Sequence, residues 1–216
     1  MKRFHWTSFD VRGLLPADWE HEVREFAAGH RTAKELVPTS VTSRESTTVE
    51  KIPVMTVGGL TVKERLPWLY DLYHGLFRTL AQQCTSEPVT TARDDRYGAV
   101  LNVQEGASMR YECHVDSNPI EGLLYCTTHL PGEGGELVVA NSTEAADVDA
   151  VEADASVVYP IAGNLILFDA RDFAHYVRPL EDDGAVRIVA AMNFYIPSSP
   201  EEHRPSDLNR HLFGRD

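Results

Sequence analysis

The hydrophobic positions of this chain change their spacing near residue 97, from a helical period to a strand-like period. In the N-terminal part, Trp19, Val23 and Phe26 recur at spacings of four and three, which predicts an amphipathic helix over residues 16–30. Residues 38–50 are rich in hydroxyl side chains and are expected to form a loop or a Thr-rich edge strand.

A longer helical pattern follows in the same half of the chain. Apolar side chains recur from Leu66 to Leu80 at spacings of three and four, which predicts one helix over residues 62–83. The pattern Thr61-x-x-Glu64 resembles a capping box at its start, and Pro67 is acceptable only near the first turn. We expect this helix to pack along one face of a sheet.

From residue 97 onward, short apolar or alternating runs are separated by Gly, Pro, Asn and Asp, as strands are separated by turns. The acidic, Ala-rich stretch 141–155 is expected to be a surface loop, and no helix is predicted among the strands. Eight short strands in about 100 residues favour a double-sheet jelly roll. The predicted strands are residues 97–103, 108–115, 122–128, 135–140, 156–159, 164–169, 175–180 and 186–196.

The predicted fold is therefore mainly β with flanking α. It is a double-stranded β-helix, or jelly roll, with N-terminal helices packed on one sheet. The length suits a single domain over residues 1–216. Within it we expect an N-terminal helical buttress over 1–90, a jelly-roll catalytic core over 97–196 and a C-terminal cap or tail over 197–216.

Composition narrows the class of partner. The formal net charge of −13 argues against a nucleic-acid partner, because affinity for phosphate comes largely from Lys and Arg. The chain shows neither a signal peptide nor an apolar run of the ~20 residues that a membrane helix needs. Three cysteines without metal-binding spacing indicate reduced thiols, so we expect a cytoplasmic protein with no membrane partner. The sequence carries no signal for an oligomeric state.

Candidate chemistry begins at the end of the second predicted strand. His114 and Asp116 are two residues apart, and in an extended chain such side chains leave the same face. An imidazole nitrogen and a carboxylate oxygen can then converge on one metal ion, with His175 as the best candidate for a third ligand. Two His and one carboxylate on one face of an octahedron leave open positions that suit non-haem Fe(II).

The last predicted strand carries an unusual polar pair. Alternation places Arg187 and Asn193 on one face, together with small apolar side chains. A buried arginine needs an anionic partner, and its planar guanidinium matches a carboxylate in bidentate fashion. Asn193 is accordingly the preferred residue on the substrate side.

These features together resemble the Fe(II)/2-oxoglutarate-dependent oxygenases, including their prolyl-hydroxylase-like and amino-acid-hydroxylating members. The resemblance covers roughly residues 97–196 and rests on several motifs in the family's order and spacing. They are His114-x-Asp116, the turn Gly134-Gly135-Glu136, the strand 163–168 before His175, the segment His175-x-Val177-x-Pro179, and Arg187 about a dozen residues later.

The resemblance implies roles for these residues. His114, Asp116 and His175 would hold Fe(II), and Arg187 would bind the distal carboxylate of the co-substrate 2-oxoglutarate. Polar contacts to the co-substrate are expected from Asn102, Gln104 and Tyr125, with core packing as the alternative for Gln104 and Tyr125. Fe(II), 2-oxoglutarate and O₂ would together hydroxylate an unactivated C–H bond and release succinate and CO₂. In the related halogenases a small residue replaces the carboxylate ligand, so Asp116 predicts oxygen transfer.

The substrate side is less determined. Arg110 has the parity of His114 and is expected either to meet a charged substrate or to lie at a solvated strand end. Arg171 is expected either to contact a substrate carboxylate or to form a rim salt bridge. The expected substrate is a free amino acid or a similar small polar metabolite. A peptidyl (prolyl-type) hydroxylase and a non-catalytic, cupin-like metal-binding protein are the alternatives.

Overall fold

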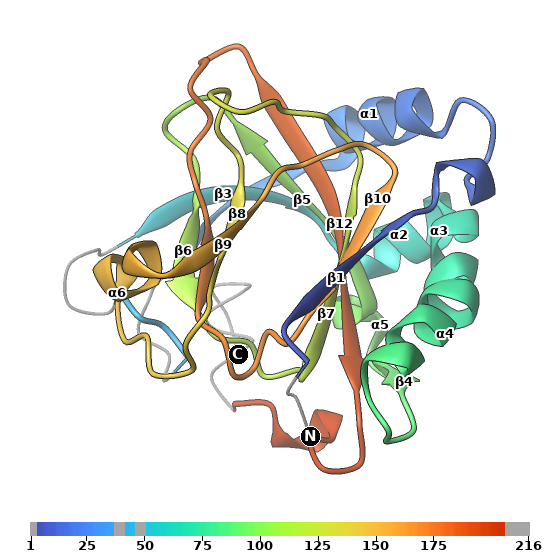
Figure 1. Cartoon of the computed structure of the whole chain (residues 1–216). Helices are drawn as coiled ribbons and strands as arrows, with labels where there is room; N and C mark the ends of the chain where they lie inside the picture. Colours follow the sequence, from blue (N-terminus) through green and yellow to red (C-terminus); the bar gives the residue numbers. More distant parts are fainter. Residues whose placement is uncertain (1–3, 37–41, 46–50, 206–216) are drawn as a thin grey trace.

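Two antiparallel sheets form the body of the protein, seen in a computed structural model that describes residues 4–36, 42–45 and 51–205. Figure 1 shows the sheets facing each other around an open centre. The larger sheet runs, in spatial order, β1 (Trp6–Asp10), β10 (Asn164–Phe168), β7 (Ile120–Tyr125), β12 (Val186–Tyr195), β5 (Ala99–Glu105), β3 (Ile52–Val57) and β2 (Thr32–Leu36), with β4 (Thr90–Thr91) also paired to β12. The smaller sheet runs β6 (Tyr111–His114), β11 (His175–Val177), β8 (Leu137–Ala140) and β9 (Ala155–Val158).

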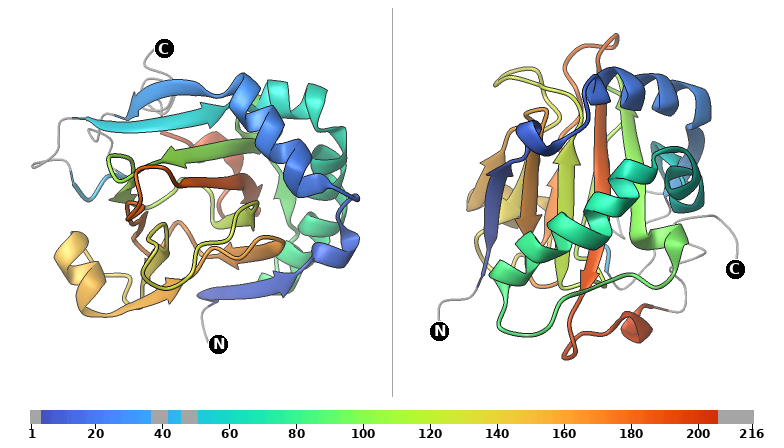
Figure 2. Two further views of the ribbon diagram at one scale, coloured as in Figure 1. Left: turned by 90° about the horizontal axis from the view of Figure 1, so that it is seen from above. Right: turned by 90° about the vertical axis from the view of Figure 1, so that its right-hand side faces the viewer.

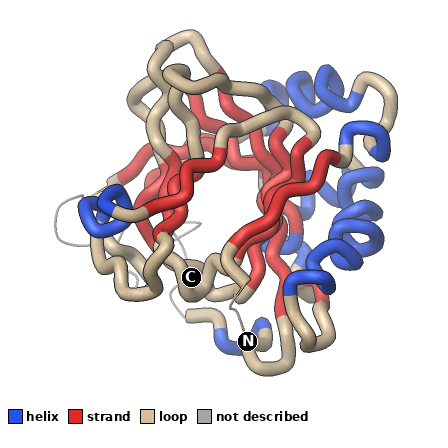
Figure 3. The backbone as a smooth tube through the Cα atoms, viewed as in Figure 1, coloured by secondary structure: helices blue, strands red, loops and turns tan. Residues whose placement is uncertain are grey.

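This arrangement is the double-stranded β-helix that the strand pattern predicts. All eight predicted strands are present, from β5 to β12, and the strands in Figure 3 enclose the space between the sheets. The first begins later than predicted, because Asp94 caps a short helix, α5 (Asp95–Gly98), through its side chain. Apolar side chains between the sheets come from both of them, among them Leu123, Leu137 and Val189.

The N-terminal helices cover the outer face of the larger sheet, as expected (Figure 2). Helix α1 (Trp19–His30) buries Trp19, Val23 and Phe26 against it, the face that the spacing predicts. It begins at Trp19 rather than at residue 16, because Asp18 adopts a left-handed conformation (φ 60°) that cannot belong to the helix.

The single helix predicted over 62–83 is wrong in detail, because the segment is broken. It consists of α2 (Gly59–Arg65), α3 (Pro67–Leu72), a π-helical turn η2 (Tyr73–Phe77), α4 (Arg78–Ala81) and a 3₁₀ turn η3 (Gln82–Cys84). The break falls at Leu66 (φ −122°, ψ 61°), because Pro67 has no N–H and starts a new helix. Thr61 lies inside α2, so the predicted capping box is absent.

Residues 1–90 are not only a helical buttress. Their described part also extends the larger sheet at both edges, since β1 pairs with β10 and β3 pairs with β5. A 3₁₀ turn, η1 (Arg12–Leu14), connects β1 to the segment before α1. The edge strands therefore complete a sheet whose centre lies in the C-terminal half of the chain.

The predicted surface loop at 141–155 contains a helix, α6 (Val148–Ala153). Asp147 caps it by accepting a hydrogen bond from the backbone N–H of Ala150 (2.8 Å). Val151 is fully buried against the outer face of the smaller sheet. One apolar turn is too short to show a helical period, so the sequence pattern missed it.

The two segments with the weakest patterns are only partly described. Residues 42–45 lie along the edge of β6, where the Val115 N–H donates to the Thr42 carbonyl (3.0 Å). The rest of the predicted loop or edge strand at 38–50 lies outside the described residues, as does the C-terminal segment after the short turn η4 (Glu201–His203), from residue 206 onward. Among the described helices, none has the length and apolarity to cross a membrane.

Candidate metal centre and its cavity

Strand pairing brings the three predicted metal ligands together. His114 at the end of β6 is the register partner of His175 at the start of β11, and their ring centroids are 4.5 Å apart. The Nε2 atom of His114 lies 3.3 Å from Oδ1 of Asp116, and Nε2 of His175 lies 3.6 Å from Oδ2. Within the described chain this is the one group of three or more His, Cys, Asp or Glu side chains with convergent donor atoms.

Backbone contacts orient all three side chains. Nδ1 of His114 lies 2.7 Å from the Glu112 carbonyl, and Nδ1 of His175 lies 3.1 Å from the Phe173 carbonyl. Because Nδ1 donates these bonds, Nε2 is the atom of each imidazole that faces Asp116 and that a metal ion would bind. The backbone N–H of Asp116 donates to the Ala170 carbonyl (2.8 Å), which ties the carboxylate to the segment before β11.

The electrostatics of this group match a cation site. Burial opposes the charged form of His114, yet the neighbouring Asp116 carboxylate raises its pKa to about 9. Burial likewise opposes ionisation of Asp116, but both imidazoles lower its pKa, so it is a carboxylate. Two imidazoles and one carboxylate whose donor atoms converge on one point fit Fe(II). The backbone of the described structure already brings these three side chains together.

A cavity of about 200 Å³ adjoins the three ligands, between the two sheets. Its apolar lining comes mainly from facing strands and includes Val100, Leu123, Leu137, Val189 and Ala191. Charged side chains of both signs also line it, including Lys34, Arg96 and Glu121. A concave, largely apolar space with a few polar groups is typical of small-molecule sites.

Arg187 lies at one end of this cavity and is 1% exposed. Its guanidinium carbon is 5.4 Å from the centroid of the Tyr125 ring, while its Nε and Nη2 atoms have no hydrogen-bond partner in the described structure. The buried hydroxyl of Tyr111, which also lines the cavity, has none either. A buried arginine without an anion is costly, so these orphaned donors fit a carboxylate ligand such as that of 2-oxoglutarate.

The other residues predicted for the co-substrate lie near this end. Tyr125 is buried, and its backbone is the register partner of Val189 on β12. Asn102 lines the cavity from β5, opposite Val189 on its other side. Gln104 lies deeper and donates its amide to the carbonyls of Met109 (2.9 Å) and Arg178 (2.8 Å), which is a structural role.

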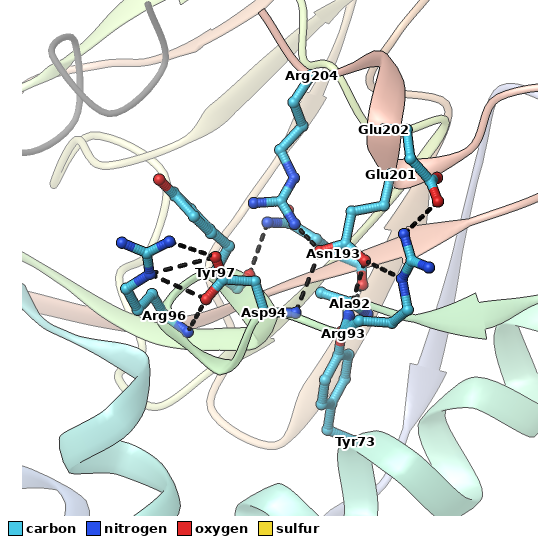
Figure 4. A network of polar contacts seen from close by, with 10 residues as sticks. All are labelled: Tyr73, Ala92, Arg93, Asp94, Arg96, Tyr97, Asn193, Glu201, Glu202 and Arg204. Atoms are coloured by element: carbon cyan, nitrogen blue, oxygen red, sulfur yellow. Dashed lines mark hydrogen bonds and ion pairs between the residues drawn. The ribbon is translucent and has the colours of Figure 1, made fainter. Parts of the chain in front are cut away.

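Asn193 lines the opposite end of the same cavity, on the face it shares with Arg187. Its side-chain amide donates to the Tyr97 carbonyl (2.7 Å), and its own carbonyl accepts a hydrogen bond from the Tyr73 hydroxyl (2.5 Å). Figure 4 shows this residue inside a polar network that reaches the C-terminal turn, where Glu201 pairs with both Arg93 and Arg204. Asn193 is therefore fixed in position at the cavity wall.

Two residues predicted to contact substrate do not reach the cavity. Arg110 forms a two-pronged ion pair with the buried Glu45 (2.8 and 2.5 Å), which also accepts the Cys113 N–H, so its guanidinium holds segment 42–45 against β6. Arg171 donates to the Ser117 carbonyl (3.3 Å) and the Ser199 hydroxyl (2.5 Å), and it lines a separate surface groove. Neither side chain lines the cavity, because each is held by partners that strand parity and proximity in sequence do not reveal.

Sequence reasoning also missed residues that line the cavity. Glu121 lies one position before the predicted strand 122–128, although it belongs to β7. Its parity with Leu123 and Tyr125 places it on the inward face, but the predicted bounds left it out. Lys34 and Thr56 belong to the edge strand β2 and to its neighbour β3, in a part of the chain that was predicted to be a helical buttress. No local signal places these N-terminal residues beside the jelly roll.

Comparison with known proteins agrees with this geometry. The family model described as the 2OG-Fe(II) oxygenase superfamily matches residues 98–195, a segment that contains all three convergent ligands and Arg187. None of the curated protein sequences matches the chain.

Solved structures share the fold at low sequence identity. The AviO1 structure from Streptomyces viridochromogenes Tue57 has a TM-score of 0.63 and 17% identity, with 92% of each chain covered. The α-ketoglutarate-dependent epimerase SnoN from nogalamycin biosynthesis has a TM-score of 0.62 and 15% identity, covering 93% of this chain and 82% of the other. A prolyl hydroxylase from Trichoplax adhaerens, in complex with a hypoxia inducible factor peptide fragment, has a TM-score of 0.55 and 16% identity, covering 90% and 85%.

The fold, the convergent His–Asp–His group and the matched segment agree with one another. Enzymes of the matched family use Fe(II), 2-oxoglutarate and O₂. Residues 98–195 of this chain thus match the family model of the 2OG-Fe(II) oxygenase superfamily and hold all the residues of the convergent group.

Proposed function

We propose that the protein hydroxylates an unactivated C–H bond of a small polar metabolite, with a free amino acid as the first candidate. The observation that carries this proposal is the single cavity of about 200 Å³, which joins the His–Asp–His group to the buried guanidinium of Arg187. Both acidic and basic side chains line the cavity, as recognition of a zwitterion requires.

In this proposal each residue has a defined task. His114, His175 and Asp116 hold Fe(II), and Arg187 binds the distal carboxylate of 2-oxoglutarate, with Tyr125 and Asn102 beside it. When bound, iron and co-substrate together activate O₂, with oxidation of 2-oxoglutarate to succinate and CO₂ and transfer of oxygen to the substrate. The apolar walls exclude water, and Asn193 lies on the substrate side.

Asp116 favours hydroxylation over halogenation, since a carboxylate occupies the ligand position that a halide would need. The product should therefore incorporate oxygen from ¹⁸O₂ and contain no chlorine when the reaction is run in chloride. A chlorinated product from the wild-type protein would contradict this assignment.

A peptide substrate is the second candidate, favoured by the shared fold of the peptide-bound prolyl hydroxylase. The Gly134-Gly135 turn, which suggested it, has a different explanation. Both glycines have positive φ, and a Cβ on Gly134 would lie 2.2 Å from the Pro179 carbonyl oxygen. The turn is therefore required by packing, and it does not discriminate between substrates.

Against a non-catalytic, cupin-like role stand the match to an oxygenase family model and a buried guanidinium with no anionic partner among the described residues. The cytoplasmic location that we propose accords with three cysteines that are all unpaired.

The test is succinate release from 2-oxoglutarate by the protein with Fe(II) and ascorbate, screened against free amino acids, simple amines and proline-containing peptides. Stimulation by free amino acids with a matching hydroxylated product supports the proposal. Stimulation by peptides alone would transfer the assignment to the second candidate. Absence of 2-oxoglutarate binding would overturn both.

A further inference from the structure

One buried carboxyl group in the cavity has no role in the chemistry described so far. On β7, the side chains of Glu121, Leu123 and Tyr125 all face inward, and Glu121 is 6% exposed. Across the sheet it is the register partner of Asn193 on β12. Glu121 therefore lines the end of the cavity opposite Arg187, on the sheet that faces the metal ligands.

The hydrogen bonds of Glu121 hold the carboxyl group but do not neutralise it. Its Oε2 atom accepts from the Asn118 side-chain amide (2.8 Å), which also donates to the Ile120 carbonyl (3.1 Å). The backbone N–H of Met192 also favours the ionised form. No Lys, Arg or His side chain of the described chain forms an ion pair with Glu121, and Asp116 adds a like charge nearby.

Such a group is expensive in a protein interior. Burial and the negative charge of Asp116 both raise the pKa of Glu121, so the carboxylate form is disfavoured until a cation lies beside it. An apolar residue at this position would pack against Leu123 and Ala191 at lower cost, so fold stability does not explain the carboxyl group. A cationic ligand would give Glu121 the ion-pair partner that the described chain does not provide.

We propose that Glu121, oriented by Asn118, binds a positively charged ammonium group of the substrate. The proposal rests on the hydroxylase function proposed above and names its substrate class, a compound with a free amine. It also assigns the two ends of the cavity to opposite charges, with Arg187 for a carboxylate and Glu121 for an ammonium group. Asn193, fixed by Tyr97, supplies a polar neighbour at the same end.

The experiment compares each free amine with its N-acetylated form. The protein, loaded with Fe(II) and 2-oxoglutarate, is assayed for succinate release with a panel of amino acids and simple amines. Binding of the same pairs is measured without O₂ by calorimetric titration. We expect free amines to bind and stimulate, and their N-acetyl forms to do neither, because acetylation removes the charge.

Variants then locate the effect. Glu121→Gln keeps the shape and should raise the KM for the amine about 100-fold or more, a change expected for loss of one partner of a buried charge pair. The KM for 2-oxoglutarate should stay the same. Glu121→Asp keeps the charge and should retain the preference for the free amine. Glu144→Gln removes an equal charge from the exposed 141–155 segment and is the matched control.

The outcomes separate the two proposals. If no free amine binds more tightly than its N-acetyl form, or if Glu121→Gln keeps the wild-type KM, the role of Glu121 is refuted while the hydroxylase function stands. If the wild-type protein fails to bind 2-oxoglutarate and releases no succinate with any compound, the proposed function itself has failed. Calorimetric binding of amines would still report on Glu121 in that case.

Discussion

His114 and His175 are 61 positions apart in the chain, yet they face each other directly as register partners across β6 and β11. The pairing of two strands in the smaller sheet, rather than any local motif, brings their Nε2 atoms to one point beside Asp116. A change to either residue should therefore act on the metal and leave the sheet intact.

His175→Ala should abolish stable iron binding. Removal of one of three protein ligands leaves only His114 and Asp116. The wild-type protein should become more stable as the Fe(II) concentration rises above Kd, and the variant should lose this stabilisation. The measurement is iron content after reconstitution and dialysis, together with the shift in melting temperature on adding Fe(II). His203→Ala, on the exposed η4 turn, is the control. Full iron occupancy in His175→Ala would exclude this ligand.

Arg187→Ala should weaken 2-oxoglutarate binding about 100-fold or more, given about 1.5–3 kcal/mol for each hydrogen bond to a charged group. Arg187→Lys keeps the charge but loses the bidentate guanidinium, so its affinity for 2-oxoglutarate should lie between those of the wild type and Arg187→Ala. Titration with 2-oxoglutarate in the absence of O₂ measures the effect. Arg178→Ala, whose guanidinium pairs with Glu152 on the surface (2.7 Å), should bind as the wild type does. If Arg187→Ala bound 2-oxoglutarate as tightly as the wild type does, the role of Arg187 as its carboxylate ligand would be excluded.

Tyr73→Phe should destabilise the fold by about 2 kcal/mol. The Tyr73 hydroxyl accepts the Ala92 N–H (2.7 Å) and donates to the Asn193 carbonyl (2.5 Å), and both buried groups would lose their partner. Urea unfolding followed by circular dichroism measures the difference. Tyr159→Phe, at a position that is 38% exposed, should change little. Equal stability of Tyr73→Phe and the wild type would show that this bridge contributes nothing.

Gly134→Ala should cost more stability than Gly132→Ala, although both glycines have positive φ. At Gly132 a Cβ meets nothing within 4 Å, so only the left-handed backbone is penalised, by about 1–2 kcal/mol. At Gly134 a Cβ would also collide with the Pro179 carbonyl oxygen, which adds about 1–3 kcal/mol. The difference in the free energy of unfolding between the two variants, measured by urea unfolding, gives the contribution of the contact with Pro179. Equal free energies of unfolding would show that the turn relaxes to avoid this contact.

Stability should fall as pH drops below about 6.5 because of His129. Burial lowers the pKa of this imidazole, whose Nε2 lies 3.1 Å from the Val186 carbonyl. The unfolded chain thus takes up a proton near the ordinary value of 6.5, and the folded chain only at lower pH, so the free energy of unfolding rises with pH through that window. His129→Gln keeps an amide donor and should flatten this dependence in urea unfolding. An unchanged slope would assign the dependence to other groups.

Part of this molecule could be predicted from local patterns. The inward face of β12 is an example, since alternation alone places Arg187, Val189 and Asn193 on one side. Their cavity depends on the packing of whole sheets, so parity and proximity in sequence did not show that Arg110 and Arg171 lie outside its lining. Glu45 and Ser199 reach these side chains from distant segments, and no local pattern contains that information.

Three features can be read from the residues alone: the strand period after residue 97, the shared strand face of His114 and Asp116, and the resemblance to an oxygenase family. These follow from short-range geometry, in which side chains two residues apart share a face. The sequence names His175 as the candidate third ligand, but the fold was needed to show how it meets His114, that β1 and β3 extend the larger sheet, and that Glu121 faces the cavity opposite Arg187. Such relationships depend on strand order and register between segments far apart in the chain, which are set by the packing of the complete fold.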